Sequence, residues 1–440
     1  MKDEPKNTKK NSRNSQKIMN RVMMGVLALA VLLMGALVVY ALRIGINQPS
    51  VATGVVVTEA PLEQPPTETA PVQTEAPTTQ APATAEPEPE TDPNLEKAQA
   101  LLETLTLEQK VGQLLFATPD SLAGVAGADI AGNMTRDALQ RYPVGGVVYF
   151  SQNIRSESQI VEMVRKTQEY SSVPMFVGVD EEGGRVSRLS RVGITETLEP
   201  MATYGEAGNA ETVKAIGQRL GTQLLAAGFN LNFAPVADVI TNPENTEIGD
   251  RSFSSDPQVA AQMVAAMTSG LQESGVSACL KHFPGHGSTS ADSHTGASVS
   301  HRSLDELRAT EFLPFRAGIE AGVGMVMLSH MSLPEITGDN TPCDLSYKIV
   351  TELLRQELGY EGVIVSDSHE MASITNYYDC ADAAVMAVQA GCDIVLMPRS
   401  VSEAFYGLLA AVQNGSITEG RINESVLRIL TLKYRMGIIA

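Results

Sequence analysis

The segment Lys281-His282-Phe283-Pro284-Gly285-His286-Gly287 shows most clearly how this chain is built. An apolar run over 278–283 has the composition of a buried strand, and the Pro-Gly pair that follows ends it in a loop. The loop continues through Asp292 and His294, so three of the six histidines of the chain lie between residues 282 and 294. Histidines grouped in this way at the end of a strand indicate a functional site rather than core packing.

Outward from this segment, apolar strand-like runs alternate with amphipathic helical ones. The strand-like runs are 114–117, 146–150, 175–180, 231–235, 278–283, 325–330, 363–367 and 394–397. The helical runs between them include 157–170, 210–227, 257–274, 304–321, 347–358 and 379–390. Alternation of this kind builds a parallel sheet, and eight units predict an α/β fold of the (β/α)8 TIM-like barrel type. A doubly wound open sheet is the alternative.

Polar residues stand at the carboxyl ends of several predicted strands. They are Asp180, Asp238, Lys281 with His282, His330 and Asp367. In a barrel these ends share one face, and the active sites of barrel enzymes lie on that face. The sequence therefore predicts a single site assembled from residues that are far apart in the chain.

Asp367 is the strongest candidate for a reacting group. It ends a strongly apolar strand, so its carboxylate should be partly desolvated at the barrel mouth. There it could act as a nucleophile, bind a metal, or cap the next helix. We favour the nucleophile.

His294 follows Asp292 by two residues. A carboxylate bonded to one imidazole nitrogen fixes the tautomer and makes the other nitrogen a better base, which suits a general acid and base near neutral pH. A metal site formed by His282, His286, Asp292 and His294 is the weaker alternative, because the Pro-Gly pair forbids a helix that would align the first two. Arg188 and Arg251 could bind substrate hydroxyls, although each could equally form a surface ion pair.

Composition excludes some classes of function. The net charge is -19 and no basic stripe is present, so nucleic-acid binding is not expected. The absence of Trp argues for a small ligand or a chain end rather than a long polysaccharide. No cofactor is expected, and the protein should be a monomer. The four cysteines, which lack metal-type spacing, are Cys279, Cys343, Cys380 and Cys392.

The first 94 residues differ from the rest. Residues 1–21 are basic, and 22–42 form an uncharged apolar run closed by Arg43. A helix of that length spans about 30 Å, enough to cross a bilayer, and the basic residues before it place 1–21 in the cytoplasm. A cleaved signal peptide is the alternative. Residues 43–94 are rich in Pro, Thr, Glu and Ala and predict a disordered linker. The chain should therefore be a single-pass protein of the cell membrane, with the domain of residues 95–440 outside the cell.

The motifs together resemble family 3 glycoside hydrolases, in the branch of β-N-acetylglucosaminidases. The resemblance rests on 281–287 with 292–294, and on 178–186, 232–239, 242–243 with 249–253, 362–367 and 421–433. It covers nearly all of residues 97–437. It implies a single barrel domain, because the residues after Asp367 suffice only for the last strand and its helices.

The resemblance also implies a mechanism and site residues. Asp367 would attack the anomeric carbon, and His294, oriented by Asp292, would be the general acid and base. Asp180, Arg188, Arg251, Lys281 and His282 would bind the terminal sugar. Retaining glycosidases ordinarily use two carboxyl groups, so here a His-Asp pair would take the second role.

The chain departs from the family pattern at two places. Ser288 stands where the family's loop usually reads Gly-His-Gly-Asp-Thr, and Ser368-His369 follows Asp367 where this branch commonly has a second Asp and then Leu. Both departures lie beside the reacting centre, so they bear on the rate and the leaving group. The additional His369 could also alter the pH profile.

The leading hypothesis is an exo-acting β-N-acetylglucosaminidase that trims peptidoglycan fragments, such as muropeptides, outside a bacterial membrane. Another exo-β-glycosidase, such as a β-glucosidase or xylosidase, is the nearest alternative. A phosphorylase is a third, because a His acid/base repels phosphate less than a carboxylate does. A cell-wall-binding module without turnover and a metallohydrolase are alternatives of other classes.

Overall fold

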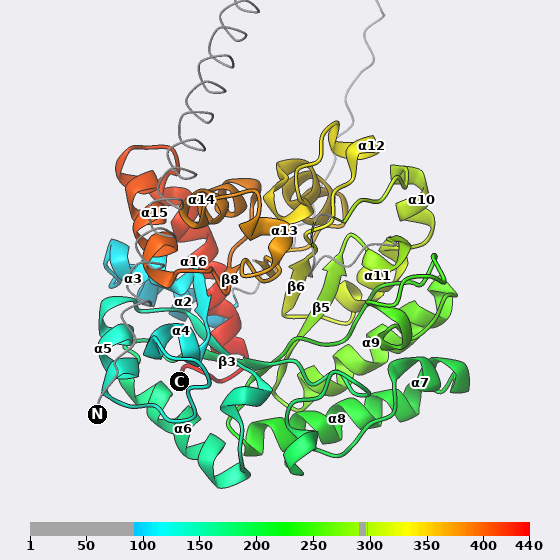
Figure 1. Ribbon diagram of the computed structural model, residues 1–440, viewed down its shortest axis with the longest axis horizontal. Helices are drawn as coiled ribbons and strands as arrows, with labels where there is room; N and C mark the ends of the chain where they lie inside the picture. The colour runs from blue at the N-terminus through cyan, green and yellow to red at the C-terminus, as the bar shows by residue number, and fades with distance from the viewer. Residues whose placement is uncertain (1–91, 290–295, 297) are drawn as a thin grey trace, which may run out of the picture. The chain divides into compact units, whose positions relative to one another are not determined.

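Eight parallel strands form a ring at the centre of the domain that the structure describes (Figure 1). The computed structural model describes residues 92–289, 296 and 298–440. The strands are β1 (Leu115–Ala117), β2 (Gly146–Tyr149), β3 (Phe176–Val179), β4 (Leu231–Asn232), β5 (Ser277–Phe283), β6 (Met325–Leu328), β7 (Val363–Val365) and β8 (Val395–Leu396). Every strand residue is buried, as expected of a sheet with helices outside and a filled barrel within.

The strand order is β7-β6-β5-β4-β3-β2-β1-β8, so each strand pairs with its sequence neighbour and β1 pairs with β8. A parallel bridge between Val365 and Ile394 joins the two remaining edges. The Ser366 N–H also donates to the Ile394 carbonyl at 3.0 Å. The ring is therefore nearly closed, which confirms the predicted TIM-like barrel and excludes the open sheet.

Helices surround the ring (Figure 1). They are α2 (Pro93–Leu102), α3 (Leu107–Gln113), α4 (Pro119–Ala123), α5 (Asn133–Arg141), α6 (Glu157–Tyr170), α7 (Met201–Ala207), α8 (Ala210–Ala226), α9 (Pro257–Glu273), α10 (Leu304–Ala309), α11 (Phe312–Glu320), α12 (Pro334–Thr337), the π-helix η6 (Lys348–Glu357), α13 (Ala372–Thr375), α14 (Cys380–Ala390), α15 (Val401–Gln413) and α16 (Glu419–Arg435).

Local sequence signals set many helix starts. The Asp256 side chain accepts the Gln258 N–H ahead of Pro257 at the start of α9, and Asn209 accepts the Thr212 N–H at the start of α8. Such caps satisfy backbone N–H groups that have no partner within the helix.

Two predicted elements were wrong in extent. The run 304–321 is two helices, α10 and α11, because the chain breaks at Thr310 and Glu311 and the Glu311 side chain is buried against Arg302, with Nη2 and Oε2 3.0 Å apart. The run 231–235 is a strand only at Leu231–Asn232. Pro235, having no N–H, cannot donate to the ladder.

Within the described ranges, no helix is both long enough and apolar enough to cross a membrane. The predicted tail 1–21, the predicted membrane helix 22–42 and the predicted linker as far as residue 91 lie outside those ranges, as do Asp292 and His294. Those predictions therefore remain predictions.

Candidate active site

A cavity of about 570 Å³ lies at the carboxyl ends of the barrel strands. Six of the eight residues predicted from the sequence line it, and the other two, Asp292 and His294, are outside the described residues. The fold thus brings together side chains that the sequence separates by up to 187 positions, from Asp180 to Asp367. The six are Asp180, Arg188, Arg251, Lys281, His282 and Asp367.

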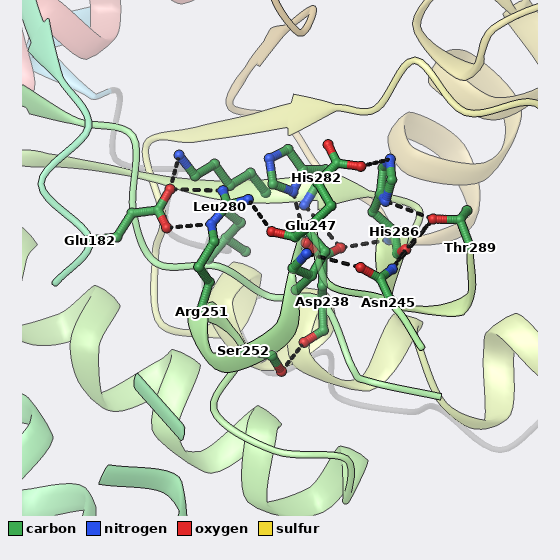
Figure 2. Close-up of polar contacts among 12 residues, drawn as sticks. Glu182, Asp238, Asn245, Glu247, Arg251, Ser252, Leu280, His282, His286 and Thr289 are labelled. Carbon is green, nitrogen blue, oxygen red and sulfur yellow. Dashed lines mark hydrogen bonds and ion pairs between the residues drawn. The ribbon is translucent and has the colours of Figure 1, made fainter. Parts of the chain in front are cut away.

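Four of the cavity's charged residues form a continuous chain of ion pairs. The Lys281 ammonium lies 2.6 Å from Asp180 Oδ1 and 2.6 Å from Glu182 Oε1. Arg251 holds the same Glu182 in a bidentate pair, with Nε to Oε2 at 2.8 Å and Nη2 to Oε1 at 2.9 Å (Figure 2). Two cations and two carboxylates alternate along this chain of ion pairs, so their charges balance.

Glu182 and Lys281 stay ionised although they are buried. Burial alone would raise the pKa of Glu182, but Arg251 and Lys281 hold it well below its usual range. Burial opposes the charge on Lys281 too, yet Asp180 and Glu182 raise the pKa of its ammonium above the ordinary value. A rigid set of ionised groups of this kind can donate hydrogen bonds to ligand hydroxyls, and accept hydrogen bonds from them, without first reorganising.

Glu181, beside Asp180, points away from the cavity and shapes the loop that carries Arg188. Its carboxylate accepts the backbone N–H groups of residues 188–190 at 2.6, 2.8 and 3.2 Å. Arg188 is thereby presented to the cavity, with Nη2 3.9 Å from Asp180 Oδ2 and its guanidinium over the Phe150 ring.

His282 is oriented by Asp238. Its Nδ1 lies 2.7 Å from Asp238 Oδ2, while Asp238 Oδ1 accepts the backbone N–H of His282 at 3.2 Å and that of His286 at 2.6 Å (Figure 2). Burial would raise the pKa of Asp238, but the two histidines lower it below its usual value. An ionised Asp238 favours a hydrogen on Nδ1 of His282. In the neutral ring, Nε2 then carries no hydrogen.

The Pro-Gly-His-Gly turn fits only because of its glycines. Gly285 has φ 129°, a conformation that side chains rarely adopt, and a Cβ on Gly287 would lie 1.9 Å from the Val239 carbonyl oxygen. His286 itself is buried, with Nδ1 3.0 Å from Thr289 Oγ1, and Asn245 donates to its carbonyl (Figure 2). Burial lowers the pKa of His286.

Asp367 lies two residues after the end of β7. Its Oδ1 accepts the Ser368 N–H at 2.7 Å, and its carbonyl accepts the Ser366 hydroxyl at 2.8 Å. The same hydroxyl accepts the Leu396 N–H at 2.9 Å, which ties this strand end to β8. The carboxylate is therefore held at the barrel mouth with a defined orientation.

Neither Glu182 nor Asp238 was predicted to have a role in the site. Glu182 was left as a salt-bridge partner or a helix-start charge, although its place two residues after Asp180 puts both on the same side of an extended chain. Asp238 was noted as a strand end without a role. Only the fold shows that these two acids position Lys281, Arg251 and His282.

The described residues contain no group of three or more His, Cys, Asp or Glu side chains arranged to hold a metal ion. Two members of the alternative metal set, His282 and His286, are instead bonded to Asp238 and Thr289. The other two members lie outside the described residues.

The model of the glycosyl hydrolase family 3 N-terminal domain matches residues 106–432. The chain belongs to glycosyl hydrolase family 3. This confirms the family resemblance and the expectation of a glycoside hydrolase, and it agrees with the barrel and with the place of the cavity.

The chain is similar to named β-hexosaminidases and to a solved β-N-acetylglucosaminidase. The chain is 34% identical over 328 residues to β-hexosaminidase A of Pseudoalteromonas piscicida, covering 68% of this chain but only 55% of that protein. It is 36% identical over 314 residues to a β-hexosaminidase of Stenotrophomonas maltophilia, covering 70% and 92%. Among solved structures, a family 3 β-N-acetylglucosaminidase from a Paenibacillus species is 38% identical with a TM-score of 0.72, covering 77% of this chain and 64% of that one.

Proposed function

We propose that this family 3 protein is an exo-acting, retaining β-N-acetylglucosaminidase that releases terminal N-acetylglucosamine from peptidoglycan-derived fragments. The observation that carries the proposal is the cavity itself. One compartment of about 570 Å³ at the strand ends is lined by Asp367 and by the five residues expected to bind the sugar. A volume of this order suits one sugar ring better than a polymer.

In the first step, an Asp367 carboxylate oxygen forms a bond to the anomeric carbon as the bond to the leaving oxygen breaks. His294 gives its proton to that oxygen. In the second step, water loses a proton to His294 and attacks the same carbon, and the bond to Asp367 breaks with its electron pair returning to the carboxylate. Two inversions give overall retention. The role of His294 with Asp292 rests on the sequence alone.

The chain of ion pairs supplies recognition of the terminal sugar. Asp180 can accept from sugar hydroxyls while Lys281 and Arg188 donate to them. Because these groups already pair with one another, they remain oriented when the cavity is empty. Preorganised donors and acceptors of this kind stabilise the transition state more than water would.

A second hollow, of about 500 Å³, adjoins the first cavity and could hold the leaving group. It shares Phe150, Glu370 and Met397 with the first cavity and also reaches Arg399. A glycan with its terminal ring in the first cavity has room there for the next residue. An exo-acting enzyme on short fragments fits two adjoining hollows.

The choice of N-acetylglucosamine draws on the relatives, which are named β-hexosaminidases and a β-N-acetylglucosaminidase. The cell-wall setting draws on the sequence. An apolar anchor at 22–42 and a linker over 43–94 would place the enzyme outside the membrane, where peptidoglycan fragments occur.

The test is hydrolysis by the full-length protein of 4-nitrophenyl β-N-acetylglucosaminide beside the β-glucoside and β-xyloside, with and without phosphate. Turnover of the first substrate in phosphate-free buffer, at least tenfold faster than the others, is expected. A preference for glucoside or xyloside would replace the sugar assignment. A requirement for phosphate, with a sugar 1-phosphate as product, would indicate a phosphorylase. No turnover of any would leave a binding module.

A further inference from the structure

A second buried polar cluster lies next to the Asp367 segment and is separate from the chain of ion pairs that lines the cavity. It consists of His330, which follows β6, Asp344 in the short turn η5 (Cys343–Leu345), and His369, which follows β7. Their exposed fractions are 2%, 0% and 3%. Buried ionisable groups are unfavourable unless they are paired, so the arrangement of this cluster calls for an explanation.

The Asp344 carboxylate bridges the two imidazoles. Its Oδ1 lies 3.0 Å from His330 Nδ1, and its Oδ2 lies 3.0 Å from His369 Nε2. The other nitrogen of His330, Nε2, lies 2.8 Å from the carbonyl oxygen of Ser368. Ser368 in turn gives its N–H to Asp367 Oδ1. A single residue therefore separates the cluster from the proposed nucleophile.

The contacts of its two ring nitrogens indicate the charge of His330. A carbonyl oxygen only accepts, so Nε2 must carry a hydrogen, while Nδ1 lies at ion-pair distance, 3.0 Å, from a carboxylate oxygen without forming a hydrogen bond to it. In a neutral ring with its one hydrogen on Nε2, the Nδ1 lone pair would face that carboxylate oxygen, whereas a second hydrogen on Nδ1 turns the repulsion into an ion pair. Burial opposes that charge, but Asp344 and then Asp367 raise the pKa of His330 to about 9. Burial would raise the pKa of Asp344, yet His330 and His369 lower it below its usual range.

Three other ionisable groups around the cluster add no charge, while Asp379, Arg399 and Glu403 line a hollow beside His369. Burial raises the pKa of the Cys343 and Cys392 thiols, and it also raises that of the Tyr378 hydroxyl, so all three are neutral near pH 7. Cys392 Sγ lies 3.4 Å from the Asp344 carbonyl oxygen. Asp344 is therefore the carboxylate in contact with His330, and the Asp367 carboxylate also favours the charge on the ring.

We propose that Asp344 and His369 are positioning residues for the reaction at Asp367: Asp344, steadied by His369, holds a cationic His330 against the Ser368 carbonyl, and this fixes the nucleophile and places positive charge behind it. The inference rests on the proposed role of Asp367. His369 is one of the two departures from the family pattern, and its partner in this chain is Asp344.

The positive charge should matter most in the second step. There, the oxygen of water bonds to the anomeric carbon, and Asp367 leaves as a carboxylate. A nearby cation stabilises the departing carboxylate and also keeps the free nucleophile ionised at lower pH. Loss of the cation should slow breakdown of the glycosyl-enzyme and move the acidic limb of the kcat/KM profile to higher pH.

The experiment compares full-length Asp344→Asn with Asp393→Asn. Asp393 is equally buried but lies just before β8, where it accepts the Ile364 N–H and pairs with Arg355, both at 2.9 Å. Both variants should lower the melting temperature. Only Asp344→Asn should move the acidic limb upward, by about one pH unit, because removal of an interacting opposite charge shifts a pKa by at least that amount. It should also lower kcat at least tenfold on a substrate with a good leaving group, for which the second step limits turnover.

A pair of variants at His369 tests the cluster without removing the carboxylate. His369→Leu loses the donor to Asp344 Oδ2, whereas His369→Gln can keep one. The Leu variant should show an upward shift of the acidic limb that is smaller than that of Asp344→Asn. In the Gln variant the acidic limb should lie close to its wild-type position. These two variants decide the question if Asp344→Asn does not fold.

An acidic limb that is unchanged from wild type in Asp344→Asn, or in His369→Leu where only that variant folds, would overturn the inference and leave the cluster a purely structural role. A wild-type protein that turns over no β-glycoside would overturn the proposed function, and this inference with it. The two failures differ, because the first requires an active wild-type enzyme.

Discussion

Asp367 and His294 are the residues on which the proposed chemistry depends, and each can be tested by one substitution. Asp367→Asn keeps an oxygen that can accept the Ser368 N–H but removes the nucleophilic charge. We expect kcat to fall by on the order of 10⁴ or more, with thermal unfolding unchanged. Steady-state hydrolysis of 4-nitrophenyl β-N-acetylglucosaminide and a melting curve measure both. A variant that retains a tenth of wild-type activity would rule out Asp367 as the nucleophile.

His294→Ala should show a loss that depends on the leaving group. A 2,4-dinitrophenyl glycoside needs little protonation, so its first step should be nearly unaffected, whereas an alkyl glycoside should react about 10² to 10⁴ times more slowly. The ratio of kcat/KM for the two substrates measures this effect. Equal losses on both would assign His294 a structural role instead.

At the scale of elements, Glu182 joins the loop that follows β3 to the loop that follows β4 and to strand β5. It is 3% exposed and is the shared partner of Arg251 and Lys281. Glu182→Gln leaves two buried cations with one remaining carboxylate, Asp180. We expect a loss of about 3 kcal/mol in the free energy of unfolding and a raised KM.

Glu162 provides the matched control for Glu182. It also pairs with two cations, Arg165 and Lys166, but on the surface of α6, where its side chain is half exposed. Glu162→Gln should change stability far less than Glu182→Gln, because solvent screens exposed ion pairs. Urea unfolding of both variants makes the comparison, and equal losses would show that burial is not what makes Glu182 important.

For the whole molecule, Lys433 ties the two ends of the barrel domain together. It is fully buried in α16, donates to Gln113 Oε1 of α3 at 2.7 Å, and lies over the Phe176 ring. Burial lowers the pKa of Lys433 to about 7 from an ordinary 10.5. Between those two pH values the unfolded chain binds a proton that the folded chain does not, so stability should rise as pH increases from 7 towards 10.

Lys433→Met should remove that rise. Below pH 7 the variant should be more stable than wild type by on the order of 1–3 kcal/mol, less the contribution of the lost Gln113 bond. Chemical denaturation at pH 6, 8 and 9.5 measures the difference. A wild-type profile that is flat across this range would contradict the lowered pKa.

The membrane attachment predicted from the sequence is likewise a property of the whole chain. Full-length protein should sediment with membranes, and protease cleavage within residues 43–94 should release active enzyme. Recovery of all activity as soluble protein, with a new N-terminus near residue 43, would favour a cleaved signal peptide.

The sequence determined the architecture, because its signals are local. Apolar runs such as 363–367 and helical runs such as 157–170 can be recognised from their own residues, and their alternation admits few folds. All eight strands lie where they were expected, and α6 has the predicted bounds. Asp180, Lys281 and Asp367 could be predicted as one site because strand ends of a barrel share a face.

Only the tertiary structure decided which polar groups pair. Glu182 carries no local sign that it will meet Arg251, 69 positions away, and nothing beside His330 or His369 indicates Asp344 as their common partner. Such pairs depend on how the loops after neighbouring strands pack, and on the requirement that each buried charge find a partner. Folding brings the partners of buried charges together, and their separation in the sequence follows no fixed spacing that could be recognised beforehand.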